Sequence, residues 1–133
     1  MKSALITGAA GQDGTILATL LRRQGVDVIG VVKPGTSTSH LTQYAPGIVI
    51  VECDLSDVDS VRDTVAQARP DEIYNLGGIS SIVESQENPE LTHRTNVDAV
   101  RAILPPRSAS STCRSRRWPS AQRRRTSRRD RGP

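Results

Sequence analysis

The residues best suited to chemistry are three glycines near the N-terminus, Gly8, Gly11 and Gly14, which recur at three-residue spacing. Glycine has no Cβ atom, so it permits a tight turn and lets the backbone come close to a ligand. An apolar run precedes these glycines and a helix-like apolar pattern follows them, so the positive end of a helix dipole would face the same ligand. The pattern predicts a cradle for a dinucleotide pyrophosphate, with an ordinary glycine-rich turn as the alternative.

A basic residue follows the second predicted strand. Lys33 comes directly after Val32, where a carboxylate would bond the ribose 2′-hydroxyl of NAD and a basic residue would accommodate the 2′-phosphate of NADP. No carboxylate follows Val32 until Glu52. The sequence therefore favours NADP over NAD as the cofactor, and the alternative is a solvated lysine that opens a loop at residues 34–39.

Two further strand ends carry candidate residues. Asp54 and Leu55 follow the third predicted strand, and ligands of open α/β sheets collect at the carboxyl ends of strands, so we expect both residues at the adenine. The alternative role, which is compatible with the first, is that Asp54 or Ser56 caps the next helix. After the fourth strand, residues 77–78 are both glycine and offer a second place where backbone could pass close to the cofactor.

Strands and helices of a parallel α/β sheet must position these residues. Strands are expected at residues 2–7, 26–32, 48–53 and 72–76, and helices at 12–24, 57–68 and from Pro89 onward. The apolar stripes of the first and last helices consist of Ile16, Leu17, Leu20 and Leu21, and of Leu91, Val97, Val100 and Leu104. The pattern predicts the first four strands of a Rossmann-type doubly wound parallel sheet, in spatial order 3-2-1-4, with helices on both faces.

Composition changes abruptly near Leu104. Residues 1–104 carry eight Lys or Arg and thirteen Asp or Glu, whereas residues 105–133 carry ten Arg and one Asp. We therefore expect a truncated NADP-binding domain at 1–104 and a disordered Arg-rich tail at 105–133, which has too few apolar residues to offset chain entropy.

Three origins are open for the tail: a basic arm for nucleic acid, a solvated tail without function, or out-of-frame translation. The last is favoured, because the family resemblance described below ends inside a predicted helix. A nucleic-acid partner is therefore not expected.

Cysteine use and hydropathy exclude other classes of protein. Cys53 and Cys113 are the two cysteines, and they make neither a disulfide framework nor a metal cluster. No apolar run reaches the roughly 18 residues of a membrane span, and the N-terminus lacks the pattern of a secretory signal. A cytoplasmic protein without a membrane partner is expected.

Four stretches together resemble a known family. They are Thr7-Gly8-x-x-Gly11-Gln12-Asp13-Gly14, Asp54-Leu55, Glu72-Ile73-Tyr74-Asn75-Leu76-Gly77 and Asn96-Val97-Asp98-Ala99. Over residues 3 to about 104 the chain resembles the extended short-chain dehydrogenase/reductases and is most similar to the GDP-mannose 4,6-dehydratases. The resemblance implies a nucleotide-sugar substrate and a tightly bound NADP that takes hydride from C4 of the sugar, permits loss of water across C5–C6 and returns the hydride to C6.

The resemblance also implies roles for individual residues. It places Gly8, Ala9, Ala10, Gly11, Gln12 and Asp13 on the diphosphate, with Gly14 completing the glycine motif; Lys33 near the 2′-phosphate; Asp54 and Leu55 at the adenine; and Leu76, Gly77, Gly78, Ile79 and Ser80 beside the ribose and nicotinamide. Relatives often carry a tyrosine where this chain has His93, which is expected to be a surface or packing residue rather than an acid or base.

The chain departs from the family in its catalytic residues. The family's Ser or Thr, its acid/base carboxylate and its Tyr-x-x-x-Lys pair follow the region of resemblance, and none is recognisable here. The two tyrosines, Tyr44 and Tyr74, have no lysine four residues on, so no group is evident that removes the C4 hydroxyl proton. We expect no catalytic residues and an inactive chain. A non-catalytic NAD(P)-binding module and a fragment of another sugar-nucleotide epimerase or dehydratase are the alternatives.

The expected sheet is also unfinished, because later strands should cover the outer side of residues 72–76. An uncovered edge strand is a template for pairing with another chain. The sequence therefore predicts marginal stability or a homo-oligomer.

Overall fold

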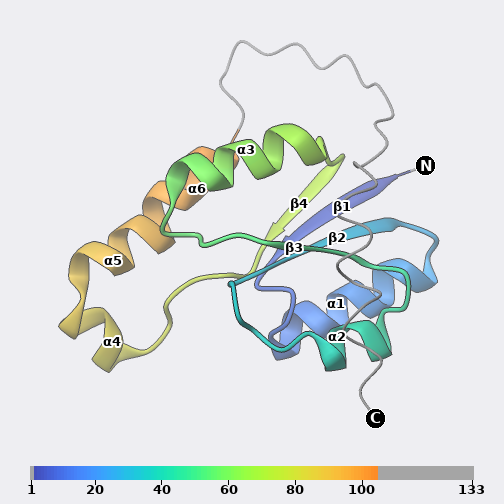
Figure 1. Ribbon diagram of the computed structural model, residues 1–133, viewed down its shortest axis with the longest axis horizontal. Coiled ribbons are helices and arrows are strands. Elements are labelled where there is room, and N and C mark those ends of the chain that lie inside the picture. Colours follow the sequence, from blue (N-terminus) through green and yellow to red (C-terminus); the bar gives the residue numbers. More distant parts are fainter. Residues whose placement is uncertain (1, 105–133) are drawn as a thin grey trace.

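The computed structural model describes residues 2–104, and its centre is a parallel sheet of four strands (Figure 1). The strands are β1 (Ser3–Thr7), β2 (Asp27–Val32), β3 (Val49–Glu52) and β4 (Glu72–Asn75). Their spatial order is β3-β2-β1-β4, and every neighbouring pair is parallel. The predicted order 3-2-1-4 is confirmed, and each strand falls within one residue of its expected bounds. The predictions for residues 105–133, including Cys113, lie outside the described residues.

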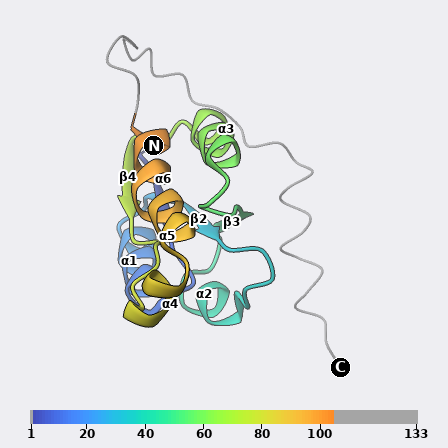
Figure 2. The same cartoon turned by 90° about the vertical axis from the view of Figure 1, so that its left-hand side faces the viewer.

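Helices cover both faces of the sheet (Figure 2). They are α1 (Gln12–Arg23), α2 (Ser39–Tyr44), α3 (Val58–Ala68), α4 (Ile82–Glu87), α5 (Pro89–His93) and α6 (Ala99–Ile103), with a π-helical segment η1 (Arg94–Asp98) between the last two. One face packs against α1 and α2, and the other against α3 and α6. None of the helices in this part of the chain is long and apolar enough to cross a membrane.

Alternating residues of β1 supply the two cores. Ala4 and Ile6 belong to the cluster that contains α1 and α2, whereas Leu5 belongs to the cluster that contains α3 and α6. Successive side chains of a strand point to opposite faces, and here both faces are covered, so the strand reads as a continuous apolar run. This is why the sequence indicated a buried parallel strand.

Two helices and two apolar stripes differ from the prediction. The short helices α2 and α4 were not predicted. In α1 the side chains of Ile16 and Leu20 are exposed, and the buried residues are Gly14, Ala18 and Leu21. At Gly14 a larger side chain would collide with the backbone of Gly8 and Ala9. At the other end of the chain Leu91 and Leu104 are exposed, while Ala99 and Ile103, four residues apart, form the buried face of α6. Gly14, Ala18 and Ala99 thus share with Leu21 and Ile103 the packing that larger apolar residues alone were expected to provide.

Candidate functional site

In the turn from β1 to α1, neighbouring backbone leaves no room for a side chain at Gly8 or Gly14. Gly8 has φ +65°, and a Cβ atom there would lie 2.8 Å from the backbone nitrogen of Gly77 and 2.9 Å from its Cα. A Cβ atom at Gly14 would overlap the carbonyl oxygen of Gly8 and lie 2.7 Å from the Cα of Ala9. These glycines therefore let the turn pack against both the loop after β4 and the start of α1. The tight turn was predicted from the glycine pattern, whereas its contact with the loop after β4 was not.

The first turn of α1 lacks a capping side chain. Its N-cap is Gly11, which makes no side-chain cap bond, whereas α3 is capped by Asp57 and α4 by Ser81. An uncapped helix start leaves backbone N–H groups and a positive dipole end for an anion. Gln12 and Asp13 open this turn and are exposed, so the residues expected at a diphosphate do surround the helix start.

Two of the candidate backbone groups are already used inside the protein. The N–H of Ala9 donates to the carbonyl of Val31 at 3.2 Å, and the Ala9 side chain is fully buried. The N–H of Gly11 donates to the carbonyl of Gly8 at 3.1 Å. Ala9 therefore joins the turn to β2, and Ala10, which is half-buried, lies between these two bonded groups.

Thr7 joins the two glycine-containing turns. Its side chain is buried, and its hydroxyl donates to Asn75 Oδ1 at 2.5 Å while accepting from the N–H of Gly77 at 3.0 Å. A buried hydroxyl needs such partners, because burial without hydrogen bonds is costly. Thr7 was singled out only as part of a motif. The signal that could have indicated its structural role is a polar residue at the end of an apolar strand.

The loop after β4 is held at its far end by Asn96. The N–H of Ile79 donates to Asn96 Oδ1 at 2.8 Å, and Asn96 Nδ2 donates to the carbonyl of Ile79 at 2.9 Å. Gly78 lies beside this pair, and Leu76 and Ser80 are exposed. The role of Asn96 was missed, because nothing in local sequence pairs it with a residue 17 positions earlier.

The end of β3 lies beside the same loop. A Cβ atom at Gly77 would overlap Leu55 Cδ1, so the Leu55 side chain lies directly on Gly77. Gly8, Leu55 and Gly77, which come from three different strand ends, therefore meet at one point. The structure thus brings together three of the segments that the sequence assigned to one cofactor.

Asp54 forms a turn with Ser56 rather than a helix cap. Asp54 Oδ1 accepts from the N–H and the hydroxyl of Ser56 at 2.9 and 2.7 Å, and these bonds, with a smaller contribution from the Lys33 charge, hold the pKa of Asp54 below its ordinary value. The cap of α3 is Asp57, whose Oδ1 accepts from the N–H of Ser60 at 3.2 Å. The capping role considered for Asp54 or Ser56 is therefore wrong, because the helix begins at Val58.

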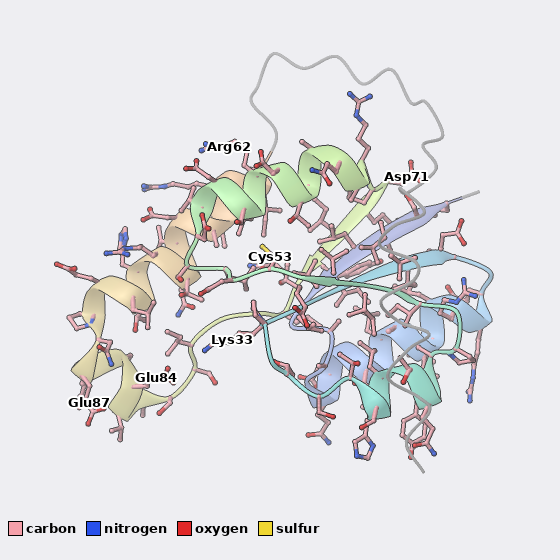
Figure 3. All side chains as sticks on the ribbon, in the orientation of Figure 1. Lys33, Cys53, Arg62, Asp71, Glu84 and Glu87 are labelled. Carbon is pink, nitrogen blue, oxygen red and sulfur yellow. The ribbon has the colours of Figure 1, made fainter. Side chains whose placement is uncertain are left out.

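Lys33 projects from the end of β2 and is exposed (Figure 3). The N–H of Cys53 donates to the carbonyl of Val32 at 2.9 Å, so the ends of β2 and β3 lie side by side with Lys33 near Asp54. Cys53 itself is buried on the α3 side of the sheet, and this burial raises the pKa of its thiol. His93 is exposed, with its Nδ1 3.5 Å from Asp98 Oδ2, as expected for a surface residue.

A groove of about 480 Å³ runs along α1 and α2. It touches the candidate residues only at Ala10, Gly11 and Gln12, and continues past the exposed Ile16 and Leu20 to Tyr44. The groove thus begins at the uncapped helix start but leads away from the carboxyl ends of the strands.

Comparisons with known proteins agree on one family. The family model for GDP-mannose 4,6 dehydratase matches residues 5–116, which extends past the point near Leu104 where the residue-by-residue resemblance was expected to end. GDP-mannose 4,6-dehydratase of Yersinia enterocolitica is 38% identical over 112 residues, covering 77% of this chain and 30% of that protein. A Vibrio cholerae protein of the same name is 35% identical, covering 77% and 29%.

Solved structures of related folds match as well. A putative epimerase from Burkholderia cenocepacia has a TM-score of 0.62 at 28% identity, covering 77% of this chain and 31% of that one. UDP-glucose 4-epimerase from Thermus thermophilus, solved with NAD, has a TM-score of 0.65 at 23% identity, covering 76% and 32%. The second likeness supports the Rossmann-type fold alone.

The chain spans about 30% of the length of these two curated relatives. The matched residues 5–116 include the glycine turn, the end of β3 and the loop after β4, which are the segments that meet in the structure. By its family match over residues 5–116, this chain belongs to the GDP-mannose 4,6-dehydratase family.

Proposed function

We propose that residues 2–104 form the NADP-binding part of a sugar-nucleotide dehydratase that acts on GDP-mannose. The observation that carries the proposal is the meeting of Gly8, Leu55 and Gly77, where a Cβ atom at Gly8 would collide with backbone and a Cβ atom at Gly77 would collide with the Leu55 side chain. A surface built from backbone at three strand ends, next to an uncapped helix start, fits the diphosphate and ribose of a dinucleotide. When bound, the nicotinamide would supply the hydride acceptor and donor for the sugar.

Each part of the cofactor has residues that suit it. The turn at residues 8–14 would hold the diphosphate, and residues 76–80 would lie along the nicotinamide ribose. Leu55 offers an apolar surface for the adenine, with Asp54 beside it. Lys33 is exposed at the neighbouring strand end, where its ammonium group could bind a 2′-phosphate, and this supports NADP over NAD.

Turnover is not part of what we propose for these 133 residues. Tyr44 lies on α2 with its side chain exposed in the groove, and Tyr74 donates its hydroxyl to Glu72 at 2.9 Å, so neither is paired with a lysine at the strand ends. The residues of the glycine turn and the β4 loop would bind and orient the cofactor. If NADP binds and GDP-mannose is not converted, the chain is a cofactor-binding module.

The test is calorimetric titration with NADP and with NAD. We expect NADP to bind more tightly, and Lys33→Ser to weaken NADP binding about tenfold or more while leaving NAD binding unchanged, because only NADP carries the 2′-phosphate. The matched control is Lys2→Ser, which removes the other lysine of the chain. Lys2 precedes β1, at the end of the sheet away from the glycine turn, so both affinities should stay unchanged. Absence of binding by either cofactor, or an equal loss of both in Lys33→Ser, contradicts the proposal.

The proposal extends to location and assembly. A buried free thiol at Cys53 suits the reducing cytoplasm. Among the described strands β4 has a neighbour on one side only, and such an edge is a template for a homo-oligomer. Light scattering over a range of concentrations tests the assembly, and a monomer throughout that range contradicts it.

A further inference from the structure

A π-helical segment interrupts the last helical run of the described chain. Helical backbone continues from α5 through η1 to α6, and only residues 94–98 adopt the wider π turn. Such turns are rare and occur frequently at functional sites, because they redirect a side chain without ending the helix. Asn96 is the central residue of this turn.

The Asn96 side chain binds the β4 loop as a neighbouring strand would. Its amide accepts from the N–H of Ile79 and donates to the carbonyl of Ile79, at 2.8 and 2.9 Å, so one side chain satisfies both backbone groups of one residue. A Cβ atom at Gly78 would lie 2.8 Å from Asn96 Oδ1. The glycine thus leaves the space that the amide needs.

Polar contacts, rather than burial, position this loop. Leu76 is 46% exposed, and Gly78 and Ser80 are exposed as well. The Thr7 hydroxyl holds Gly77 at one end of the loop, and Asn96 holds Ile79 at the other. Since little apolar surface holds residues 78–80, removal of Asn96 would free them while Gly77 stays in place.

We propose that Asn96 is a positioning residue that sets the β4 loop for the nicotinamide end of the cofactor. The inference rests on the proposed function. Asn96 acts through the backbone of Ile79 and need not touch the cofactor itself. The adenosine end would lie at Lys33, Asp54 and Leu55, which belong to other strand ends and make no bond with Asn96. Loss of Asn96 would therefore affect the two halves of the cofactor unequally.

The experiment compares two ligands on the full chain. NADP spans both halves of the site, whereas adenosine 2′,5′-bisphosphate carries only the adenosine half and its phosphates. For Asn96→Ala we expect calorimetry to give about tenfold weaker binding of NADP, equivalent to loss of the two bonds that order the loop, and unchanged binding of the bisphosphate. Asn96→Asp keeps the acceptor but loses the donor, so it should show a smaller, equally selective loss.

Hydrogen exchange without any cofactor gives a second readout, since the Ile79 amide should exchange faster in Asn96→Ala. The matched control is Asn88→Ala, which deletes the same group from the start of α5, where it caps nothing. This control should change neither binding nor exchange. An equal loss of both ligands, an unchanged NADP affinity, or unaltered exchange at Ile79 overturns the inference. Failure of the proposed function appears instead in the unsubstituted chain, as absence of binding to either ligand.

Discussion

The two glycine-containing connections at the carboxyl ends of β1 and β4 are held by different forces. Residues 8–11 join β1 to α1, and crowding of backbone against backbone at Gly8 leaves them one conformation. Residues 76–81 join β4 to α4; a partly buried hydrogen bond to Thr7 holds Gly77, and exposed hydrogen bonds of Asn96 and Ser81 hold the residues that follow. Crowding cannot relax without moving strands, whereas an exposed hydrogen bond contributes only about 0.5–1.5 kcal/mol.

Under the proposed function, the difference suits the two ends of a dinucleotide. A diphosphate presents the same charge and shape throughout a reaction, so a rigid turn serves it best. The nicotinamide end must accept substrate beside it, and a loop held by a few polar contacts can adjust at small free-energy cost. Substitutions in the two connections test whether residues 8–11 are rigid and residues 76–81 can adjust.

The largest effect is expected from Gly8→Ala. The substitution forces an L-residue to φ +65° and drives its Cβ against the backbone of Gly77, so we expect the free energy of unfolding to fall by about 3 kcal/mol or more. Urea denaturation measures the loss. The control is Gly25→Ala, at φ +79° with open space around it, which should cost only about 1 kcal/mol. Equal losses in the two variants would mean that crowding does not hold the turn.

The next effect tests the residue that the two turns share. Thr7→Val keeps the shape but leaves Asn75 Oδ1 and the N–H of Gly77 without a partner, so we expect a loss of about 2 kcal/mol in unfolding free energy. Thr7→Ser keeps the hydroxyl and should lose about 1 kcal/mol or less, for one methyl group. If Thr7→Ser lowers the unfolding free energy as much as Thr7→Val, then Thr7 stabilises the protein by packing and not by its hydrogen bonds to the two turns.

The sequence was sufficient for the topology and for the glycine turn. Runs such as 48–53 read as strands because both faces of the sheet are covered, and Gly8 was recognisable because a positive φ and close backbone contact both require glycine. The stripe of Ile16 and Leu20 was misplaced because helical spacing alone does not say which face meets the sheet. The face of α1 that packs inward carries Gly14, Ala18 and Leu21, and the close contact of Gly14 with Gly8 and Ala9 appears only once α1 is placed against the turn.

The side-chain bonds of the site could not be predicted in the same way. Thr7 and Gly77 are 70 positions apart, and Asn96 and Ile79 are 17 apart. Local periodicity carries no information on such pairs, because they depend on how β1, β4 and η1 are placed. The N-cap of α3 was assigned to Asp54 or Ser56 instead of Asp57 for a simpler reason. Asp and Ser are both favoured at an N-cap, and several of them stand close together before this helix.

A smaller effect is expected from Gly78→Ala in the adjustable loop. The new Cβ would meet only the end of the Asn96 side chain, which can turn away and give up its bonds to Ile79. We expect a loss of about 0.5–1 kcal/mol in unfolding free energy, with faster hydrogen exchange at Ile79. A loss as large as that of Gly8→Ala would show that the β4 loop is as rigid as the β1 turn.

The smallest effect concerns the opposite ends of β1 and β4, away from both turns. Glu72 accepts from Lys2 Nζ at 2.5 Å and from the Tyr74 hydroxyl at 2.9 Å, and the bond to Lys2 is the main reason that its pKa is lowered. A lowered pKa in the folded state adds stability at neutral pH that is lost as the pH falls through that pKa. Glu72→Gln should therefore have a slightly lower Tm than the unsubstituted chain at pH 7, and the difference should close at acidic pH, once Glu72 is protonated in the folded state as well.

The matched control for this pH effect is Glu87→Gln, because Glu87 is an exposed carboxylate on α4 with no ion pair recorded in the described part of the chain (Figure 3). It should give the same Tm as the unsubstituted chain at both pH values. Cofactor binding by Glu72→Gln should be unchanged, since the turns lie at the other end of the strands. A Tm difference for Glu72→Gln that is independent of pH would mean that the ion pair between Glu72 and Lys2 does not stabilise the pairing of β1 with β4. The backbone ladder between β1 and β4 and the contacts of the two turns would then hold these strands together without help from this charge.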